Sequence, residues 1–263
     1  MWLVKRYIQD DLSALLLKDD IIGEAHVFNT KAYTFNNFIV SDCNEKAYNT
    51  CVSIVDDAKG RFVVLCGPSG CGKTHLMTAT RNAYKQKYPD KSVLVMSANE
   101  LIERYIDSFE HQKTAEYVDM ICSQDLLVVD NMQFMSGRLS VQEEVAKWFC
   151  KIIEDGKSII GALDVQLDEF GGAFRTMDEQ HTGQCQIINI HEPDIVLRQK
   201  YLGHLIKNTK INVPKSVLSI LIHSEQIALG SFSGILQKFM LLQSQTNRKL
   251  TKQEMIDCIF EYL

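Results

Sequence analysis

Short apolar runs alternate with longer segments of helical periodicity up to about residue 190. Runs rich in β-branched and apolar side chains predict strands at 62–66, 93–96, 126–130, 158–162 and 186–190. Apolar residues recur at helical spacing over about 73–87, 99–120 and 140–154. Because strands that alternate with helices are typical of a parallel sheet covered by helices, the pattern predicts a five-stranded parallel sheet in an α/β fold.

Beyond Pro193 the pattern changes to helices alone. Helical segments are predicted at about 194–208, 215–228, 232–246 and 251–262. We therefore expect an N-terminal extension over 1–33, an α/β core over 34–192 and an all-helical lid over 193–263.

A glycine-rich octapeptide lies between the first predicted strand and the next predicted helix. It reads Gly67-Pro68-Ser69-Gly70-Cys71-Gly72-Lys73-Thr74, and His75 follows it. The glycines let successive backbone N–H groups point inward as an anion nest, and the helix adds the positive end of its dipole. In this motif the lysine reaches the β- and γ-phosphates and the threonine hydroxyl ligates Mg²⁺. An ordinary glycine turn is the alternative, but the complete motif favours a site for ATP or ADP with Mg²⁺, formed by residues 67–75.

The predicted strand at 126–130 ends in a carboxylate, Asp130, placed where a Walker B acid would hold Mg²⁺. The next residue is Asn131, whereas P-loop ATPases usually have a second acid there to orient the attacking water. An amide can accept a hydrogen bond from water but cannot take its proton. We therefore predict nucleotide binding with slow hydrolysis.

Two more residues are candidates for the phosphate end of the site. Asp164 follows the fourth predicted strand and is a candidate sensor of the γ-phosphate, with an ordinary polar strand end as the alternative. Arg175 is the arginine of the segment 171–185 and is a candidate to complete a neighbouring subunit's site in trans. A surface charge is the alternative for Arg175.

Composition narrows the class of protein. The 263 residues are 46% hydrophobic, which suffices for a full core, and no apolar run approaches the length of a membrane span. The eight cysteines lack the paired spacing of a zinc site, so we expect reduced thiols and a cytoplasmic protein. Cys71 is either a small loop residue or, among backbone N–H groups, a thiol of lowered pKa. The net charge of −5 argues against a protein that mainly grips nucleic-acid phosphates.

Several segments resemble the AAA+ region of DnaA, the bacterial replication initiator. They are 34–40, the P-loop, 125–134 with the following 142–144, and 190–198. The resemblance covers roughly residues 34–263 and implies an AAA+ P-loop NTPase. It also implies that adenine packs on Phe38, Ile39 and Val40.

Departures from the DnaA pattern favour the short Hda-like members of the family. A DnaA continues into a helix-turn-helix domain that reads duplex DNA, whereas this sequence ends at Leu263, so we expect no sequence-specific DNA binding. The family's lid arginine falls near Ser233, and the stretch 99–124, which touches single-stranded DNA in DnaA, is net acidic here. Hda pairs with ATP-loaded DnaA and promotes hydrolysis there. The resemblance thus implies a regulator of replication initiation that docks on a DnaA subunit, with self-association through the same AAA+ interface as an alternative.

Hda also carries an N-terminal sliding-clamp motif, a glutamine followed by leucines. The stretch 9–15 is similar but lacks an aromatic end, and a plain amphipathic helix is the alternative.

Two other functions stay open. One is a DnaA- or helicase-loader-like ATPase that assembles on DNA, which Asn131 and the acidic stretch 99–124 disfavour. The other is a scaffold with a structural nucleotide, which the intact P-loop disfavours.

Overall fold

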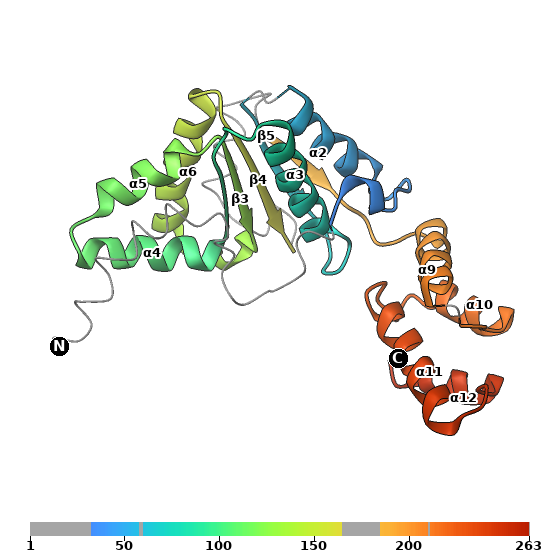
Figure 1. The fold of residues 1–263 in the computed structure, drawn as a ribbon. Coiled ribbons are helices and arrows are strands. Elements are labelled where there is room, and N and C mark those ends of the chain that lie inside the picture. Colours follow the sequence, from blue (N-terminus) through green and yellow to red (C-terminus); the bar gives the residue numbers. More distant parts are fainter. Residues whose placement is uncertain (1–32, 58–59, 165–184, 210, 263) are drawn as a thin grey trace.

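The computed structural model describes residues 33–57, 60–164, 185–209 and 211–262. An α/β body is followed by a group of helices at one side of it (Figure 1). The body contains a five-stranded sheet in the order β2-β3-β4-β1-β5, and every neighbouring pair is parallel. The strands are β1 (Phe62–Cys66), β2 (Val93–Ser97), β3 (Leu126–Asp130), β4 (Ser158–Leu163) and β5 (Cys185–Asn189). The predicted parallel sheet is confirmed, with strand ends that differ by one residue at most.

Helices cover both faces of this sheet. One face packs against α2 (Glu45–Asp57) and α3 (Lys73–Lys87), and the other packs against α4 (Ala98–Glu110), α5 (Thr114–Ser123) and α6 (Leu139–Glu154). There are two short 3₁₀ turns: η3 (Phe35–Asn37) packs against α3, and η4 (Met132–Met135) follows β3 and packs against β4. Strands buried on both faces read as continuous apolar runs, which explains why the sequence predicted them so closely.

The single helix predicted at 99–120 is wrong, because the structure has two helices there. Gln112 has a φ of 56°, in the left-handed region that helices do not use, so the chain turns between α4 and α5. The Tyr117 hydroxyl donates to the carbonyl of Leu101 at 3.0 Å and holds the two helices together. The result is a helical hairpin along one side of the body.

The C-terminal helices have a hydrophobic core of their own. They are α9 (Ile195–Thr209), α10 (Lys215–His223), α11 (Ser231–Thr246) and α12 (Lys252–Phe260), and we call them the lid. Val217, Leu221, Phe232 and Ile235 are fully buried among them. The lid therefore has enough apolar burial to pack as a unit beside the sheet.

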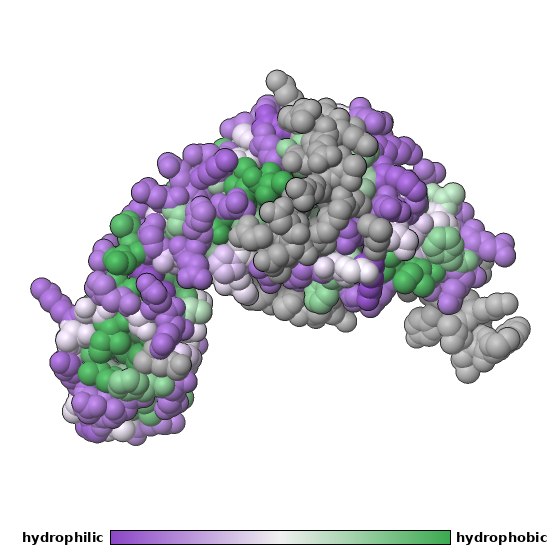
Figure 2. Space-filling model, turned by 180° about the vertical axis from the view of Figure 1, so that it is seen from behind, coloured by the Kyte–Doolittle hydropathy of each residue, from purple (hydrophilic) through white to green (hydrophobic). Residues whose placement is uncertain are grey.

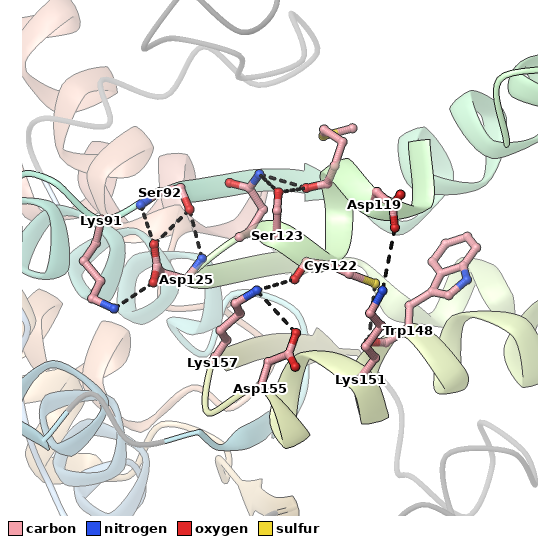
Figure 3. Close-up of polar contacts among 12 residues, drawn as sticks. Lys91, Ser92, Asp119, Cys122, Ser123, Asp125, Trp148, Lys151, Asp155 and Lys157 are labelled. Atoms are coloured by element: carbon pink, nitrogen blue, oxygen red, sulfur yellow. Dashed lines mark hydrogen bonds and ion pairs between the residues drawn. The ribbon is translucent and has the colours of Figure 1, made fainter. Parts of the chain in front are cut away.

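A polar network joins the elements at the amino end of β3, opposite the carboxyl ends of the strands (Figure 3). Asp125 accepts hydrogen bonds from the Ser92 backbone N–H at 2.9 Å and hydroxyl at 3.0 Å, and pairs with Lys91 at 2.7 Å. Lys157 donates to the carbonyl of Cys122 at 2.8 Å, which ties the start of β4 to the end of α5. These bonds align β2, β3 and β4 and so position their carboxyl ends.

The surface is mostly hydrophilic, with smaller apolar patches, one of them on the lid (Figure 2). Exposed large apolar side chains include Ile106 and Phe109 on α4 and Leu241 and Phe260 in the lid. Within the ranges that the structure describes, no helix combines the length and the apolar character needed to cross a membrane.

Candidate nucleotide-binding site

A cavity of about 520 Å³ lies at the carboxyl ends of the strands, between the body and the lid. The P-loop follows β1, and Asp130 and Asp164 lie at the ends of β3 and β4. Both carboxylates and residues 69–75 line the cavity. Ligands of open α/β sheets bind in this crevice, because the strand order reverses there.

The glycines of the P-loop are each required by its geometry. Gly70 and Gly72 have φ values of 78° and 103°, which residues other than glycine rarely adopt. A Cβ on Gly67 would lie 2.4 Å from the carbonyl oxygen of Ile190, far inside van der Waals contact. Residues 67–72 therefore adopt a tight turn that directly precedes the start of α3 at Lys73.

Lys73 is held inside the loop by three oxygen partners. Its Nζ donates to the carbonyls of Gly67 and Pro68, both at 2.8 Å, and pairs with Asp164 Oδ1 at 2.6 Å. Only 6% of its side chain is exposed. A phosphate bound in the loop would compete with Asp164 for this ammonium group, so the position of Asp164 is coupled to the occupancy of the loop.

Thr74 and Asp130 lie side by side, as a Mg²⁺ site requires. The Thr74 hydroxyl donates to Asp130 Oδ2 at 3.2 Å, and the backbone N–H of Asn131 donates to Asp130 Oδ1 at 2.8 Å. Burial raises the pKa of Asp130, although these hydrogen bonds oppose the rise. A hydroxyl and a carboxylate are hard oxygen ligands that fit Mg²⁺, whose other ligands are usually phosphates and water. Among the described residues, no group of three or more His, Cys, Asp or Glu residues forms a closed metal cage.

We expect Asp130→Asn to stabilise the protein without nucleotide, and to do so in a pH-dependent way. The folded-state pKa of Asp130 is raised above its usual 3.8 by burial, so the wild type loses stability as pH rises through that folded-state value. The variant does not titrate there. Its melting temperature should exceed that of the wild type at pH 7, and the difference should shrink toward pH 3.5.

Asp125→Asn is the matched control for that comparison. Burial acts to raise the pKa of Asp125, but hydrogen bonds from Lys91 and Ser92 lower it by more, and the net shift is downward. The control should therefore be destabilised at pH 7, opposite in sign to Asp130→Asn. Scanning calorimetry at pH 3.5 and 7 measures both, and destabilisation by Asp130→Asn at pH 7 would contradict the burial argument.

Asn131 directly precedes η4 and has a left-handed conformation, with φ 55° and ψ 45°. Its Oδ1 accepts from Gln133 Nε2 at 3.4 Å, and the same nitrogen lies 3.4 Å from Asp164 Oδ2. Gln133 therefore links the ends of β3 and β4, a role that sequence reasoning missed. Only its place three residues after Asp130 hints at this role, because side chains just beyond a strand end meet those of the neighbouring strand.

The other end of the cavity is aromatic. Phe38 and Ile39 line it, whereas Val40 uses its backbone carbonyl to accept a hydrogen bond from Lys200 of α9 at 2.9 Å. His75 also lines it, with Nε2 at 3.1 Å from both the Thr34 carbonyl and Asn37 Oδ1. Burial lowers the pKa of His75, which favours a neutral ring. An aromatic and aliphatic slot of this kind can hold a flat heterocyclic base.

Helix α9 contributes a wall to this slot that sequence reasoning did not predict. The residues of α9 that line the cavity are Leu197, Tyr201, His204, Leu205 and Asn208. Their spacing places them on one helical face, which periodicity can indicate. Periodicity cannot tell what such a face meets.

The structure assigns Cys71 to packing. Its side chain is 4% exposed, and Sγ lies 3.8 Å from Lys73 Nζ. Burial raises the pKa of Cys71 in spite of the nearby ammonium group, so a lowered pKa is wrong for this thiol. Arg175 and the stretch 9–15 fall outside the described residues, so their roles stay predictions.

The family model of the bacterial DnaA ATPase domain matches residues 29–180, more than half of the chain. The chain belongs to the bacterial DnaA ATPase domain family. The P-loop, Asp130 and Asp164 all fall within the matched residues.

Individual DnaA proteins extend the likeness to the lid. The chromosomal replication initiator protein DnaA of Roseobacter denitrificans is 27% identical over 88% of this chain and 52% of its own length. This chain therefore spans about half the length of the curated relatives it matches. Domain III of Thermotoga maritima DnaA shares the AAA+ fold, with a TM-score of 0.75, 22% identity, and coverage of 88% of this chain and 96% of that one.

A solved DnaA, the replication initiator bound to AMPPCP and single-stranded DNA, is 27% identical, with a TM-score of 0.69. The match covers 80% of this chain and 65% of that chain. The expected α/β fold with a parallel sheet and an all-helical lid is thus confirmed, and so is the resemblance to DnaA.

Proposed function

We propose that this protein binds ATP or ADP with Mg²⁺ and regulates replication initiation by docking on a DnaA subunit and promoting its inactivation, as an Hda-like protein would. The observation that carries the nucleotide part is the convergence of Lys73, Thr74 and Asp130 on one cavity at the carboxyl edge of the sheet. The relative solved with AMPPCP supports an adenine nucleotide as the ligand.

Different residues of the site would contact different parts of the nucleotide. The P-loop N–H groups and Lys73 would hold the phosphates, while Thr74 and Asp130 would hold Mg²⁺. The bound metal would neutralise phosphate charge. The amide of Asn131 can accept a hydrogen bond from water but cannot take its proton, which supports weak hydrolysis by the protein itself.

The surface of α4 supports a protein partner rather than DNA. Glu103, Asp107 and Glu110 are exposed on this helix, whereas Arg104 is only partly exposed and pairs with Glu100 at 2.7 Å. A surface of this charge repels a phosphate backbone. This disfavours the alternative of an ATPase or helicase loader that assembles on DNA, although the relative with AMPPCP does bind single-stranded DNA.

We expect the purified protein to turn over ATP far more slowly than about one per second, and Asn131→Asp to raise this rate about 10-fold or more. Aspartate tolerates the left-handed conformation of residue 131 and adds a group that can take a proton. Phosphate release under saturating Mg²⁺-ATP measures the rates. Asn99→Asp, on exposed α4, is the control and should leave the rate unchanged. A brisk wild-type rate would contradict the role given to Asn131.

The docking proposal is tested by ATP turnover of the DnaA from the same organism, with and without this protein. Stimulation that is lost in Arg175→Ala supports a trans-acting arginine and the regulatory function. Adding clamp-loaded DNA tests the further role of the sliding clamp. The opposite result is no stimulation of ATP turnover by DnaA, together with a rise in this protein's own turnover when single-stranded DNA is added. That result would favour the alternative function, an ATPase that assembles on DNA.

A further inference from the structure

Helix α9 lines the cavity with one face, and this face carries polar and aromatic side chains. Near its start, Asp194 and Arg198 lie beside the P-loop residues Pro68, Ser69 and Gly70 around a second hollow. Further along, Lys200 donates to the Val40 carbonyl. The helix therefore runs from the phosphate end of the site to its aromatic end.

Three residues of α9 lie toward that aromatic end. Tyr201, His204 and Asn208 line the same cavity as Phe38 and Ile39. The Tyr201 ring is half-buried and stacks on Phe232 of the lid core, with ring centroids 6.3 Å apart, so the lid holds this ring in place. The Asn208 amide nitrogen donates to His204 Nε2 at 3.0 Å. Because an amide nitrogen can only donate, His204 accepts this bond and orients the amide of Asn208.

The chemistry of these groups suits a base rather than a phosphate. Among the described residues that line the cavity, Lys73 is the one lysine or arginine, so α9 adds no such cation there. With its nitrogen directed to His204, the amide of Asn208 has Oδ1 left to accept from a ligand. Adenine offers an amino donor at its 6-position, whereas guanine has an oxygen acceptor there.

We propose that α9 reads the nucleobase: Tyr201 packs on its face, and Asn208, oriented by His204, accepts a hydrogen bond from the 6-amino group of adenine. This deepens the proposed function and rests on it. Since the contacts are made to the base, ATP and ADP gain from them equally. GTP can pack on Tyr201 in the same way but cannot make the hydrogen bond to Asn208.

Titration calorimetry of the full chain with Mg²⁺ and ATP, ADP or GTP tests this. The wild type should bind ATP about 10-fold or more tightly than GTP. Guanine cannot donate to Asn208 Oδ1 from its 6-position, and its own oxygen acceptor would face that oxygen. Asn208→Ala should weaken ATP and ADP binding by the same factor, about 5-fold to 10-fold, and should not weaken GTP binding, because it removes the acceptor that faces the guanine oxygen. Asn208 is exposed, so the variant should fold, and Asn99→Ala on α4 is the matched control.

The positioning role of His204 has its own readout. His204→Leu removes the acceptor and should reduce the ATP preference over GTP, whereas His204→Gln keeps an acceptor and should restore it. Equal effects of both variants would overturn the positioning role.

The remaining outcomes separate the inference from the function beneath it. If the wild type binds ATP and GTP equally well and this binding still requires Lys73, recognition of the base by α9 is wrong. The assignment of the phosphate site is then unaffected. A loss confined to ATP in Asn208→Ala overturns it as well, because the lid would then sense the γ-phosphate. Failure of the wild type to bind any nucleotide overturns the proposed function and this inference with it.

Discussion

Replacing Lys73 with alanine is expected to abolish binding of ATP and ADP, with a loss of affinity of about 100-fold or more. Nζ sits in the loop at 2.8 Å from two carbonyl oxygens and 2.6 Å from Asp164, where a bound phosphate would meet it. Hydrogen bonds to charged groups are worth roughly 1.5–3 kcal/mol each, so losing two of them to phosphate oxygens gives this magnitude. Calorimetric titration with each nucleotide is the measurement.

Lys87→Ala is the matched control for this substitution. Lys87 lies at the end of the same helix and pairs with Asp56 on the surface at 3.2 Å, far along α3 from the loop. It should bind nucleotide as the wild type does. Melting curves of both variants verify folding, and near-normal affinity of a folded Lys73→Ala protein would show that the nucleotide site is assigned wrongly.

Replacing Arg198 with methionine is expected to destabilise the lid by about 3–5 kcal/mol, while the sheet keeps its stability. Arg198 is 6% exposed, and its guanidinium donates to the carbonyls of Leu221, Ile222, Ser224 and Ile227 at 2.6 to 3.0 Å. Two of these carbonyls lie in the last turn of α10, where a helix has no partner for its last carbonyls, and a third belongs to its C-cap residue, Ser224. Methionine fills the space but removes the guanidinium donor from the carbonyls of the fully buried Leu221 and Ile227 and from that of Ile222. The Ser224 carbonyl still accepts from the Ile227 backbone N–H at 3.3 Å.

Native-state hydrogen exchange distinguishes the two parts of the chain. Amides of α10 and α11 should lose protection in Arg198→Met, whereas those of β1 and β3 should keep it. Gln199→Met changes an exposed neighbour on the same helix and should behave as the wild type. An Arg198→Met lid within about 1 kcal/mol of normal stability would mean that water satisfies these carbonyls.

Much of the fold was predictable because its signals are local. Strands β1 and β4 are buried throughout and β3 is buried up to its last residue, and such runs are apolar, as 62–66 and 126–129 are. The break between α4 and α5 was missed, because Gln112 is not a residue that marks a turn. Its left-handed conformation follows from the packing of Tyr117 on α4 rather than from its own preference.

The candidate site was likewise predictable from the sequence only in part. The P-loop could be read from eight consecutive residues, since its conformation depends on glycines at set positions. The sequence placed Asp164 at the end of a strand, but not its contact with Lys73 at 2.6 Å. That contact requires β4 to lie beside β1, which is a property of the strand order.

The sequence by itself determined the phosphate-binding loop, the strands and the family, because these depend on neighbouring residues and short spacings. Only the tertiary structure decided which distant side chains complete the site. Gln133 joins the ends of two strands, Arg198 completes the end of α10, and Tyr201 and Asn208 line one cavity with Phe38. These contacts depend on which strands lie side by side, on how the lid helices pack against one another and on how the lid packs beside the sheet. No local pattern in the chain encodes that packing.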